Sequence, residues 1–477
     1  MKRGVYPTAT TAKISLFDFS KGMRGDVDGK IAGASIPEKT FNFCFSDGAL
    51  KDGTGISNLS LPYSDGDAYP VLPSGLKPKK CYYYKRFDYT SSVEDDRLLV
   101  LCNDGYVYSY AIGMNGQFEK VEALYFTKTP GAVCYKYNGD DVMIFSSGTC
   151  FKIYDGENVT VVDGVPEVTS MCMHSERLFV TTGGEQTSLW FSDDFDPANF
   201  YLSLDQAGFI DFQDSRGRLL KVISFNNCVY VFRNYGITRL SAYGDQSEFY
   251  ATGLFLGSGR IFKNAIVDCG NRIVYLAEDG FYSFDGYYAV RILKSYDKYL
   301  LGVDNSQACG KFFNGKLYIA MRMKINGSEL DVLFVYDTAS ESSYVMDGLG
   351  VKDMEIIAAN GFSRLAMLSE NSNYIGMLYK KAECFQTPLN KVWASNFSDF
   401  GIDREKTLVK ISLFTNVNVQ ITVRSDRGEK TLSVSGDARR QAVPVRLRGN
   451  TFSVELKSSA PKAEISKVAL YFNYFKV

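Results

Sequence analysis

The stretch NRIVYLAEDGFYSFDG at residues 271–286 decides the fold. An apolar run from Ile273 to Leu276 meets an acidic turn that ends in Gly280, and a second aromatic run ends at Asp285-Gly286. An acidic residue followed by Gly between two β-prone runs is a common turn of a β-hairpin. One such hairpin is ordinary, so the informative feature is its repetition along the chain.

Seven segments repeat this hairpin of two apolar β runs around a polar or glycine-containing turn; they start near residues 96, 140, 176, 227, 271, 315 and 363. The starts lie 36 to 51 residues apart, close to the roughly 40 to 50 residues of a four-stranded propeller blade. We therefore predict turns at matching places in successive blades, near Asp104-Gly105, Gly148, Gly236 and Asp279-Gly280.

Further β runs flank the hairpins and supply four strands per unit, as in CYYYKRFDY from residue 81 and FEKVEALYF from residue 118. A lone four-stranded sheet cannot bury both faces, so the units must stack, and a closed ring removes the open ends. Two or three unrelated β-sandwiches would not require this regular spacing. We predict an all-β fold centred on a β-propeller of about seven blades, with six or eight as alternatives, over residues 79–388.

The two ends of the chain lack the repeat. Past Pro388 the runs are longer and alternate strictly, as in VNVQITVRS from residue 417, which is typical of a sheet with one wet face. We predict a C-terminal β-sandwich over residues 389–477. Residues 1–78 are predicted to form an N-terminal arm, in which one of two short β runs, AKISLFDF or KTFNFCFSDG, closes the propeller ring.

The charge of the chain is divided between these parts. The whole chain carries a net charge of -1, yet residues 401–477 hold 14 Lys/Arg against 7 Asp/Glu. A solvated sheet face is one interpretation, and a docking surface for an acidic neighbour or for DNA phosphate is the other. The candidates for a charge-dependent subunit contact are Arg424, Arg427, Arg439, Arg440, Arg446 and Arg448.

No set of residues with catalytic spacing emerges from the sequence. The sole histidine, His174, has no GxSxG or HExxH motif around it, and a structural role is the simpler interpretation. Asp193, Asp194 and Asp196 offer oxygen ligands for a divalent cation, although turn formation explains them more simply. We predict a protein that is not an enzyme and has no catalytic, cofactor-binding or metal site.

The ten cysteines include no CxxC pair and no Cys/His cluster. They lie mostly inside apolar β runs, so we predict that they are unpaired and that the chain folds in a reducing cytosol. The N-terminus has no apolar signal region, and no run of 18 apolar residues occurs. The sequence therefore predicts neither a signal peptide nor a membrane span.

Six segments of the chain are informative mainly through their order, which is more specific than any one of them. They are FDFSKGMRGD (17–26), IPEKTFNFCFSDGALKDGTG (36–55), SLWFSDDFDPANF (188–200), LLKVISFNNCVYVFRNYGITRLSAYG (219–244), the opening stretch and KVWASNFSDFG (391–401). In this order the chain resembles a family of β-propeller tail proteins of tailed bacteriophages. That family includes the packaged-DNA stabilisation and tail-nozzle proteins of short-tailed phages. One departure is Lys51-Asp52-Gly53, which stands where the family has a basic-Pro-Gly turn.

The resemblance implies a structural virion protein of the tail hub or nozzle with no catalytic residues. It implies a homo-oligomeric ring, most simply a hexamer, around the DNA ejection channel below the portal and adaptor proteins. Such a ring is assembled in the bacterial cytoplasm, retains the packaged double-stranded DNA and conducts it on ejection. A mildly acidic propeller suits a wall past which DNA slides, because each phosphate neutralised by Lys or Arg would add affinity.

A second hypothesis is a propeller module that binds or cleaves a host surface carbohydrate, since propeller glycosidases act through carboxylates and an Arg cluster without needing His. The SxDxGxxW-type boxes that recur in sialidase blades are missing from these hairpins. Binding or hydrolysis of a soluble oligosaccharide would favour this second hypothesis.

Overall fold

The opening stretch forms the predicted hairpin. The computed structural model describes residues 9–16, 19, 22–26, 36–63, 66–114, 116–183, 187–200, 207–359, 361–437 and 439–475. Strands β27 (Ile273–Ala277) and β28 (Gly280–Phe284) pair antiparallel. Gly280 has a φ of +140°, a conformation that L side chains rarely adopt. Tyr275 and Tyr282 lie opposite each other, and their rings stack with 5.2 Å between centroids.

The described residues contain seven such hairpins, six of them in sheets of four antiparallel strands and the seventh in a six-stranded sheet. The first three blades are β8 (Pro78–Tyr84), β11 (Arg97–Cys102), β12 (Tyr106–Ala111), β13 (Glu119–Tyr125); β14 (Ala132–Tyr137), β15 (Asp140–Ser147), β16 (Cys150–Tyr154), β17 (Val159–Asp163); and β18 (Val168–His174), β19 (Arg177–Thr182), β20 (Ser188–Phe191), β21 (Gly208–Asp211). The next three are β22 (Leu219–Phe225), β23 (Cys228–Arg233), β24 (Gly236–Ser241), β25 (Tyr250–Leu256); β26 (Ile261–Asp268), β27, β28, β29 (Ala289–Ile292); and β30 (Cys309–Phe313), β31 (Lys316–Ile325), β32 (Ser328–Asp337), β33 (Ser343–Asp347).

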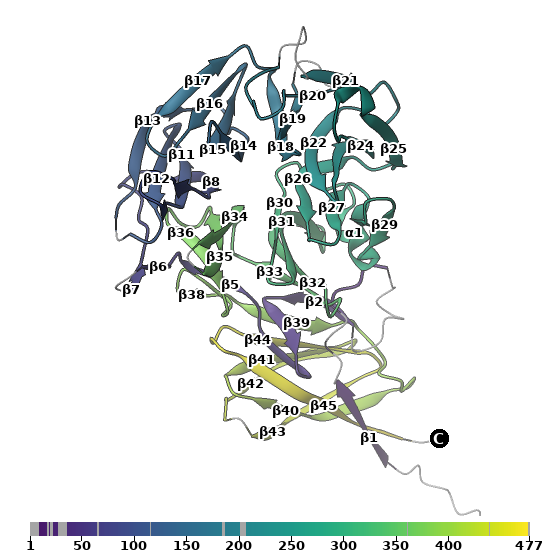
Figure 1. Cartoon of the computed structure of the whole chain (residues 1–477). Helices are drawn as coiled ribbons and strands as arrows, with labels where there is room; N and C mark the ends of the chain where they lie inside the picture. Colours follow the sequence, from purple (N-terminus) through teal and green to yellow (C-terminus); the bar gives the residue numbers. More distant parts are fainter. Residues whose placement is uncertain are drawn as a thin grey trace, which may run out of the picture.

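The seventh blade joins the two ends of the ring. It consists of β34 (Val351–Ala359), β35 (Phe362–Ser369), β36 (Ile375–Tyr379) and, as fourth strand, β5 (Gly55–Asn58). The two-residue strands β37 (Glu383–Cys384) and β38 (Thr387–Pro388) extend the same sheet beyond β5. Figure 1 shows the blades arranged around a common axis. The fold prediction of a seven-bladed propeller is confirmed, and the four predicted turns all lie between the second and third strands of their blades.

Hydrophobic packing between neighbouring blades explains why the ring closes. Each of seven buried clusters draws its side chains from two adjacent blades, as in Phe145 of the second blade against Tyr82 and Leu99 of the first. Ile56 of β5 has no exposed surface and packs in the cluster between the sixth and seventh blades. The closing strand therefore contributes to the core as well as to the sheet.

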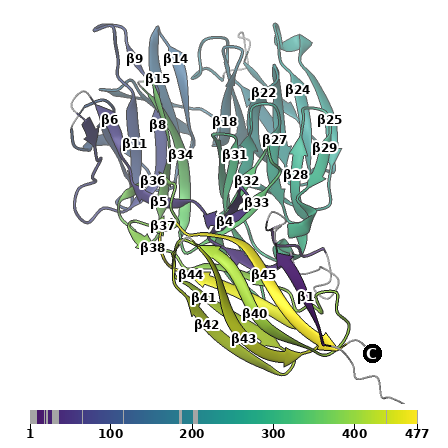
Figure 2. The same cartoon turned by 90° about the horizontal axis from the view of Figure 1, so that it is seen from below.

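The sandwich is built from both ends of the chain. One sheet contains β1 (Ala9–Leu16), β3 (Phe43–Ser46), β4 (Ala49–Asp52), β40 (Lys406–Thr415), β43 (Arg440–Gly449) and β45 (Glu464–Phe475). The other contains β2 (Pro37–Phe41), β39 (Lys391–Ser395), β41 (Val419–Ser425), β42 (Gly428–Val434) and β44 (Phe452–Ser458). One core fills the space between the two sheets, and Figure 2 shows β1 beside β45.

Two predictions about residues 1–78 need correction. AKISLFDF and KTFNFCFSDG do not close the ring: β1 pairs with β45, and β2, β3 and β4 add to the two sandwich sheets. The described parts of this segment are thus divided between the sandwich and the propeller, with Leu59, Leu61 and Leu72 packed in the cluster of the first and seventh blades, and form no separate arm; residues 1–8 and 27–35 lie outside the described residues. The physical reason is burial, since Leu16 and Phe43 fill the sandwich core.

Asn42 connects the sandwich to the propeller. It lies between β2 and β3 with a φ of +62° and is 3% exposed. Its Nδ2 donates to the carbonyl of Asn390 (2.8 Å), and its Oδ1 accepts from the backbone N–H of Asp347 at the end of β33 (2.8 Å). The polar groups of one side chain thus bind the sixth blade and the entry to β39.

The remaining elements are small. They are β6 (Leu61–Tyr63), β7 (Gly66–Ala68), β9 (Phe87–Asp88), β10 (Val93–Glu94), the 3-10 helices η1 (Gln246–Glu248) and η2 (Lys294–Tyr296), and α1 (Asp297–Leu300). Among the described residues no helix is long and apolar enough to cross a membrane.

Candidate interaction surfaces

The six predicted arginines lie on or beside β41, β42 and β43, which Figure 1 places in the part of the sandwich away from the propeller. Three of them bind carboxylates inside the sandwich. Arg424 binds Glu429 (2.8 Å) and lies 3.7 Å from the buried Glu455. Arg427 and Arg448 both bind Glu405. For these three, the interpretation as a free docking surface is weakened, because each guanidinium group already pairs with a carboxylate of the domain.

The other three arginines are exposed and form no ion pair among the described residues: Arg439, Arg440 and Arg446. Arg440 is the best positioned of them. Its Nη2 donates to the hydroxyl groups of Ser412 (3.2 Å) and Tyr471 (3.0 Å) on the two neighbouring strands. This geometry lays the guanidinium flat on the outer face of the six-stranded sheet.

Strand register extends this face across four strands. Lys13, Tyr471, Lys410 and Pro444 are successive cross-strand partners on β1, β45, β40 and β43. A neighbouring row consists of Ser15, Ala469, Ser412 and Ala442. Since side chains alternate along a strand and Ile411 and Leu413 are buried in the core, their neighbours on β40 point outward.

We name Lys13, Lys410, Arg440 and Lys467 the basic sheet face. Lys410 lies over the ring of Tyr471 (4.6 Å to the centroid), and Lys467 lies over that of Phe414 (4.8 Å).

The two rows contain no carboxylate, so the basic sheet face is not neutralised locally. The hydrogen bond with Ser412 and the positive charges of Arg440, Lys13 and Lys410 lower the pKa of the half-buried Tyr471. Lys13, Lys410 and Lys467 were missed at the sequence level. The alternation of Thr11, Lys13 and Ser15 with apolar residues was a usable signal, but the partner strand lies more than 450 residues away.

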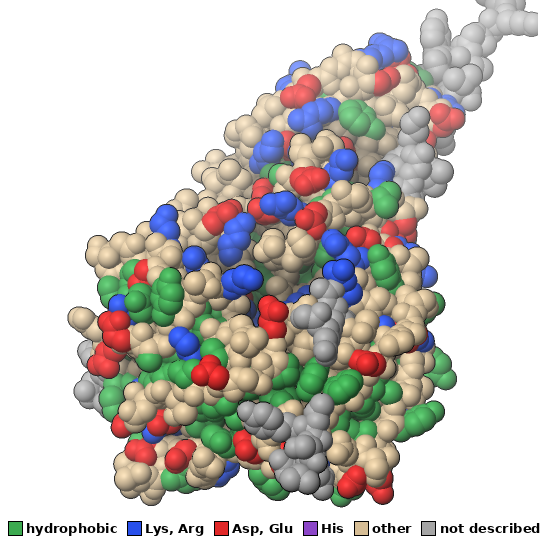
Figure 3. Space-filling view, turned by 90° about the horizontal axis from the view of Figure 1, so that it is seen from above, with side chains coloured by type: hydrophobic (Ala, Val, Ile, Leu, Met, Phe, Trp, Pro, Cys, Tyr) green, Lys and Arg blue, Asp and Glu red, His purple; other side chains and the backbone are tan. Residues whose placement is uncertain are grey.

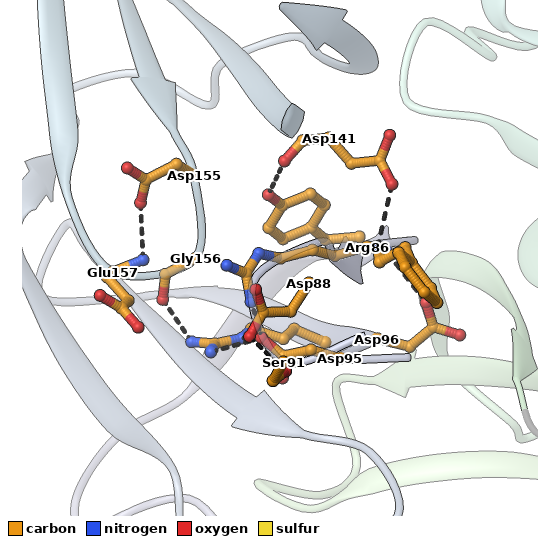
Figure 4. Close-up of polar contacts among 12 residues, drawn as sticks. Arg86, Asp88, Ser91, Asp95, Asp96, Asp141, Asp155, Gly156 and Glu157 are labelled. Carbon is orange, nitrogen blue, oxygen red and sulfur yellow. Dashed lines mark hydrogen bonds and ion pairs between the residues drawn. The ribbon is translucent and has the colours of Figure 1, made fainter. Parts of the chain in front are cut away.

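The propeller carries the opposite charge. Residues 53–388 hold 30 Lys/Arg against 40 Asp/Glu, a net charge of -10, whereas residues 9–52 are neutral and leave the sandwich basic. A dense group of carboxylates surrounds the β9–β10 hairpin, between the first and second strands of the first blade (Figure 4).

Much of this acidic group has a structural role. Asp95 binds both Arg86 and Arg97, and the hairpin backbone donates to Asp96 and Asp141 (2.9 Å each). Arg97 also donates to the carbonyl of Gly156 in the second blade. These contacts hold the hairpin against its neighbour, and Glu94, Asp140 and Glu157 remain exposed.

Hydrophobic side chains are also exposed at the rim of the propeller. Figure 3 shows the molecule from above, and hydrophobic side chains gather in the lower half of that view. Exposed examples on outer strands are Val161 of β17, Phe209 of β21 and Tyr250 of β25. The ring of Phe209 is covered on one side by Trp190, with which it stacks at 4.9 Å.

The residues considered for chemistry are engaged in structural contacts. His174 is buried beside Phe179, its Nδ1 lies 2.8 Å from the Ser224 hydroxyl, and burial lowers its pKa. Asp194 binds Arg177 (2.8 Å), and Asp196 accepts from a backbone N–H two residues on. Within the described part of the chain, no three His, Cys, Asp or Glu side chains are placed to hold a metal ion.

All ten cysteines lie in the described residues and are unpaired, as predicted. Burial raises the pKa of most of their thiols, for instance to about 12 at Cys172 and Cys309. A thiol with a raised pKa is a weak nucleophile at neutral pH. The fully buried ones, Cys81, Cys102, Cys269 and Cys384, therefore act as small hydrophobes.

Comparison with known proteins finds no matching family model and no matching curated protein. The crystal structure of BBS1N in complex with ARL6DN is similar over 68% of this chain and 96% of that chain, at 11% identity and a TM-score of 0.43. Dihydro-heme d1 dehydrogenase NirN is similar over 80% and 77%, at 10% identity and 0.41. Kluyveromyces lactis Hsv2 is similar over 57% and 95%, at 8% and 0.32. At these values the similarities carry no inference about function.

Proposed function

We propose that the chain is a structural protein of a bacteriophage tail, present in several copies that form a ring around the DNA ejection channel. The observation that carries the proposal, beside the resemblance of the ordered segments, is the division of charge between two rigid parts of one chain. The propeller carries -10, and the sandwich presents a basic sheet face without local carboxylates. Opposite fields on two domains favour one relative orientation of neighbouring copies and disfavour others.

In this proposal the basic sheet face of one copy binds the acidic propeller of the next. The contact is head-to-tail, and a head-to-tail contact closes into a ring when the rotation between copies permits it. Individual exposed ion pairs are worth only about 0 to 1 kcal/mol, so several cations must act together. A hexamer in contact with portal and adaptor proteins remains part of the proposal.

The propeller supports the same role in a second way. Closure by β5 pairs the outer edge of β36 and protects the last blade, which limits uncontrolled β pairing between crowded copies. The net negative charge of the propeller disfavours tight binding of DNA phosphate. A wall with these properties lets double-stranded DNA pass without being held.

The experiment replaces Lys13, Lys410 and Arg440 together by Glu. The expected result is a folded chain whose incorporation into particles of the encoding phage falls severalfold, most strongly at low salt, where charges are screened least. Arg424, Arg427 and Arg448 are left intact, because reversing them would place new carboxylates beside Glu429 and the buried Glu455, and would leave Glu405 without its two arginine partners.

The matched control replaces three exposed propeller lysines, Lys77, Lys128 and Lys380, by Glu, which makes the same change in total charge. Mass spectrometry of purified particles measures incorporation, and circular dichroism checks the fold. Equal incorporation of both triple variants would refute the assigned contact. A chain absent from particles that instead binds a soluble oligosaccharide would refute the proposed function itself.

A further inference from the structure

The inner strands of five blades bring charged side chains together at the propeller axis. They are Lys80 of β8, Lys221 of β22, Lys263 of β26, Lys311 of β30, and Asp353 and Glu355 of β34. These side chains lie near one another, since the pKa of Lys221 is shifted by the charges of Lys80, Lys263, Lys311 and Glu355. The cluster holds four ammonium groups and two carboxylates.

Both carboxylates are already used. Lys80 binds Asp353 (Nζ to Oδ1, 2.6 Å), which also accepts from the backbone N–H of Cys81 (3.0 Å). Lys311 binds Glu355 (Nζ to Oε1, 2.6 Å). The axis is thus left with two positive charges in excess.

Those two charges belong to Lys221 and Lys263. Each is half-buried and donates only to main-chain oxygens among the described residues, Lys221 to Ile266 (2.8 Å) and Lys263 to Thr169. A partly buried ammonium group without a carboxylate partner is costly. Burial, together with the positive charges of Lys311, Lys263 and Lys80, lowers the pKa of Lys221 to about 7.

A cavity of about 440 Å³ adjoins this cluster and contains Lys263 in its wall. It opens between the third, fourth and fifth blades, and none of its lining residues is Asp or Glu. Arg218 is a second cation at this wall and is exposed without an ion pair in the described residues. Arg260 is compensated by Glu278 (3.4 Å) and Asp304 (3.8 Å).

The rest of the wall is apolar. Leu219, Leu220, Ile261 and Phe262 supply it. A cavity of a few hundred Å³ with apolar walls and a few converging polar groups is typical of small-molecule sites.

We propose that this cavity binds a small organic anion, with its phosphate or carboxylate group at Lys263 and its apolar part along Leu219, Leu220 and Phe262. The bound anion supplies the negative charge that the axis lacks. The site is distinct from the basic sheet face and does not depend on the proposed role in a phage tail.

Phenyl phosphate is a suitable probe, because it combines a dianion with one apolar ring. Isothermal titration calorimetry of the full chain at constant ionic strength is expected to show one site per chain. Lys263→Met is expected to lower the affinity at least tenfold. Lys152→Met is the matched control. Like Lys263, Lys152 donates to main-chain oxygens, those of Ala123 and Tyr125, but it lies at the rim of the second blade.

Arg218→Ser changes an exposed side chain that has no ion pair in the described residues, so we expect this variant to fold. It is expected to weaken binding severalfold, and the test therefore holds even if Lys263→Met does not fold. Absence of saturable binding to the folded wild-type chain would overturn the proposal. The same conclusion follows if Lys263→Met, Arg218→Ser and Lys152→Met all bind with wild-type affinity. Inorganic phosphate that binds as tightly as phenyl phosphate would overturn the assignment of the apolar wall.

Discussion

Gly55→Ala is expected to open the propeller ring. Gly55 begins β5, and a Cβ built there lies 2.1 Å from the carbonyl oxygen of Lys381 and 2.3 Å from that of Glu383. Both atoms belong to the main chain, so no rotamer change relieves the clash, and the backbone must move by about 1 Å to reach ordinary contact. This movement is expected to lengthen or break the hydrogen bond that the Phe385 N–H donates to the carbonyl of Ile56 (2.8 Å).

Overpacking typically costs about 1 to 3 kcal/mol and a lost hydrogen bond about 1 kcal/mol. We therefore expect Gly55→Ala to lower the free energy of unfolding by roughly 2 to 4 kcal/mol. The matched control is Gly116→Ala, where a Cβ meets nothing within 4 Å and φ is not positive. That change is expected to be neutral or to stabilise by up to about 1 kcal/mol.

Urea unfolding gives the comparison, and hydrogen–deuterium exchange of the β36 amides tests whether the loss is local to the closing blade. We expect a lower urea midpoint and faster β36 exchange for Gly55→Ala alone. If its midpoint and its β36 exchange equal those of Gly116→Ala, then β5 is not a necessary closing strand and the reasoning fails.

Three further predictions concern stability and thiol state. Asn42→Ala should lower the free energy of unfolding by about 2 to 3 kcal/mol, because it leaves buried hydrogen-bonding groups without partners. The control Asn138→Ala, in an exposed turn of similar φ, should lower it by about 1 kcal/mol. Equal losses in calorimetry would contradict the connecting role of Asn42. As pH rises from about 7 toward 10.5, the free energy of unfolding of the wild-type chain should increase relative to that of Lys221→Met. The reason is that Lys221 keeps its proton in the unfolded chain and releases it in the folded chain. Parallel pH profiles of the two proteins would refute the lowered pKa of Lys221. Alkylation of the unreduced, denatured protein should label all ten cysteines, and mass spectrometry showing native disulfides would contradict the unpaired assignment.

The propeller was predictable from the sequence because its signals are local. Each blade repeats a turn and two apolar runs within one short segment. The spacing of the repeats and turn residues such as Gly105 and Gly280 can therefore be recognised without knowing any distant contact. The acidic character of the propeller and the structural role of His174 followed in the same way.

The composition of the sandwich was not predictable by the same means, because its pairing is non-local. Thr11 bonds to Asn473 across 462 positions, and nothing near β1 indicates that partner. The closing strand, GISN at 55–58, is too short to show alternation. For the candidate contact, the sequence identified the basic domain and Arg440. The carboxylates that pair with Arg424, Arg427 and Arg448, and the row that adds Lys13, become visible only in three dimensions.

The most direct test of the proposed function is cryo-electron microscopy of particles produced by the phage that encodes this chain, combined with mass spectrometry to identify the density. We expect a ring of copies in the tail, with Lys13, Lys410 and Arg440 of one sandwich against acidic residues of the adjacent propeller. Absence of the chain from the particles would contradict the proposed function. A ring in which the basic sheet face points into solvent would contradict the assigned contact.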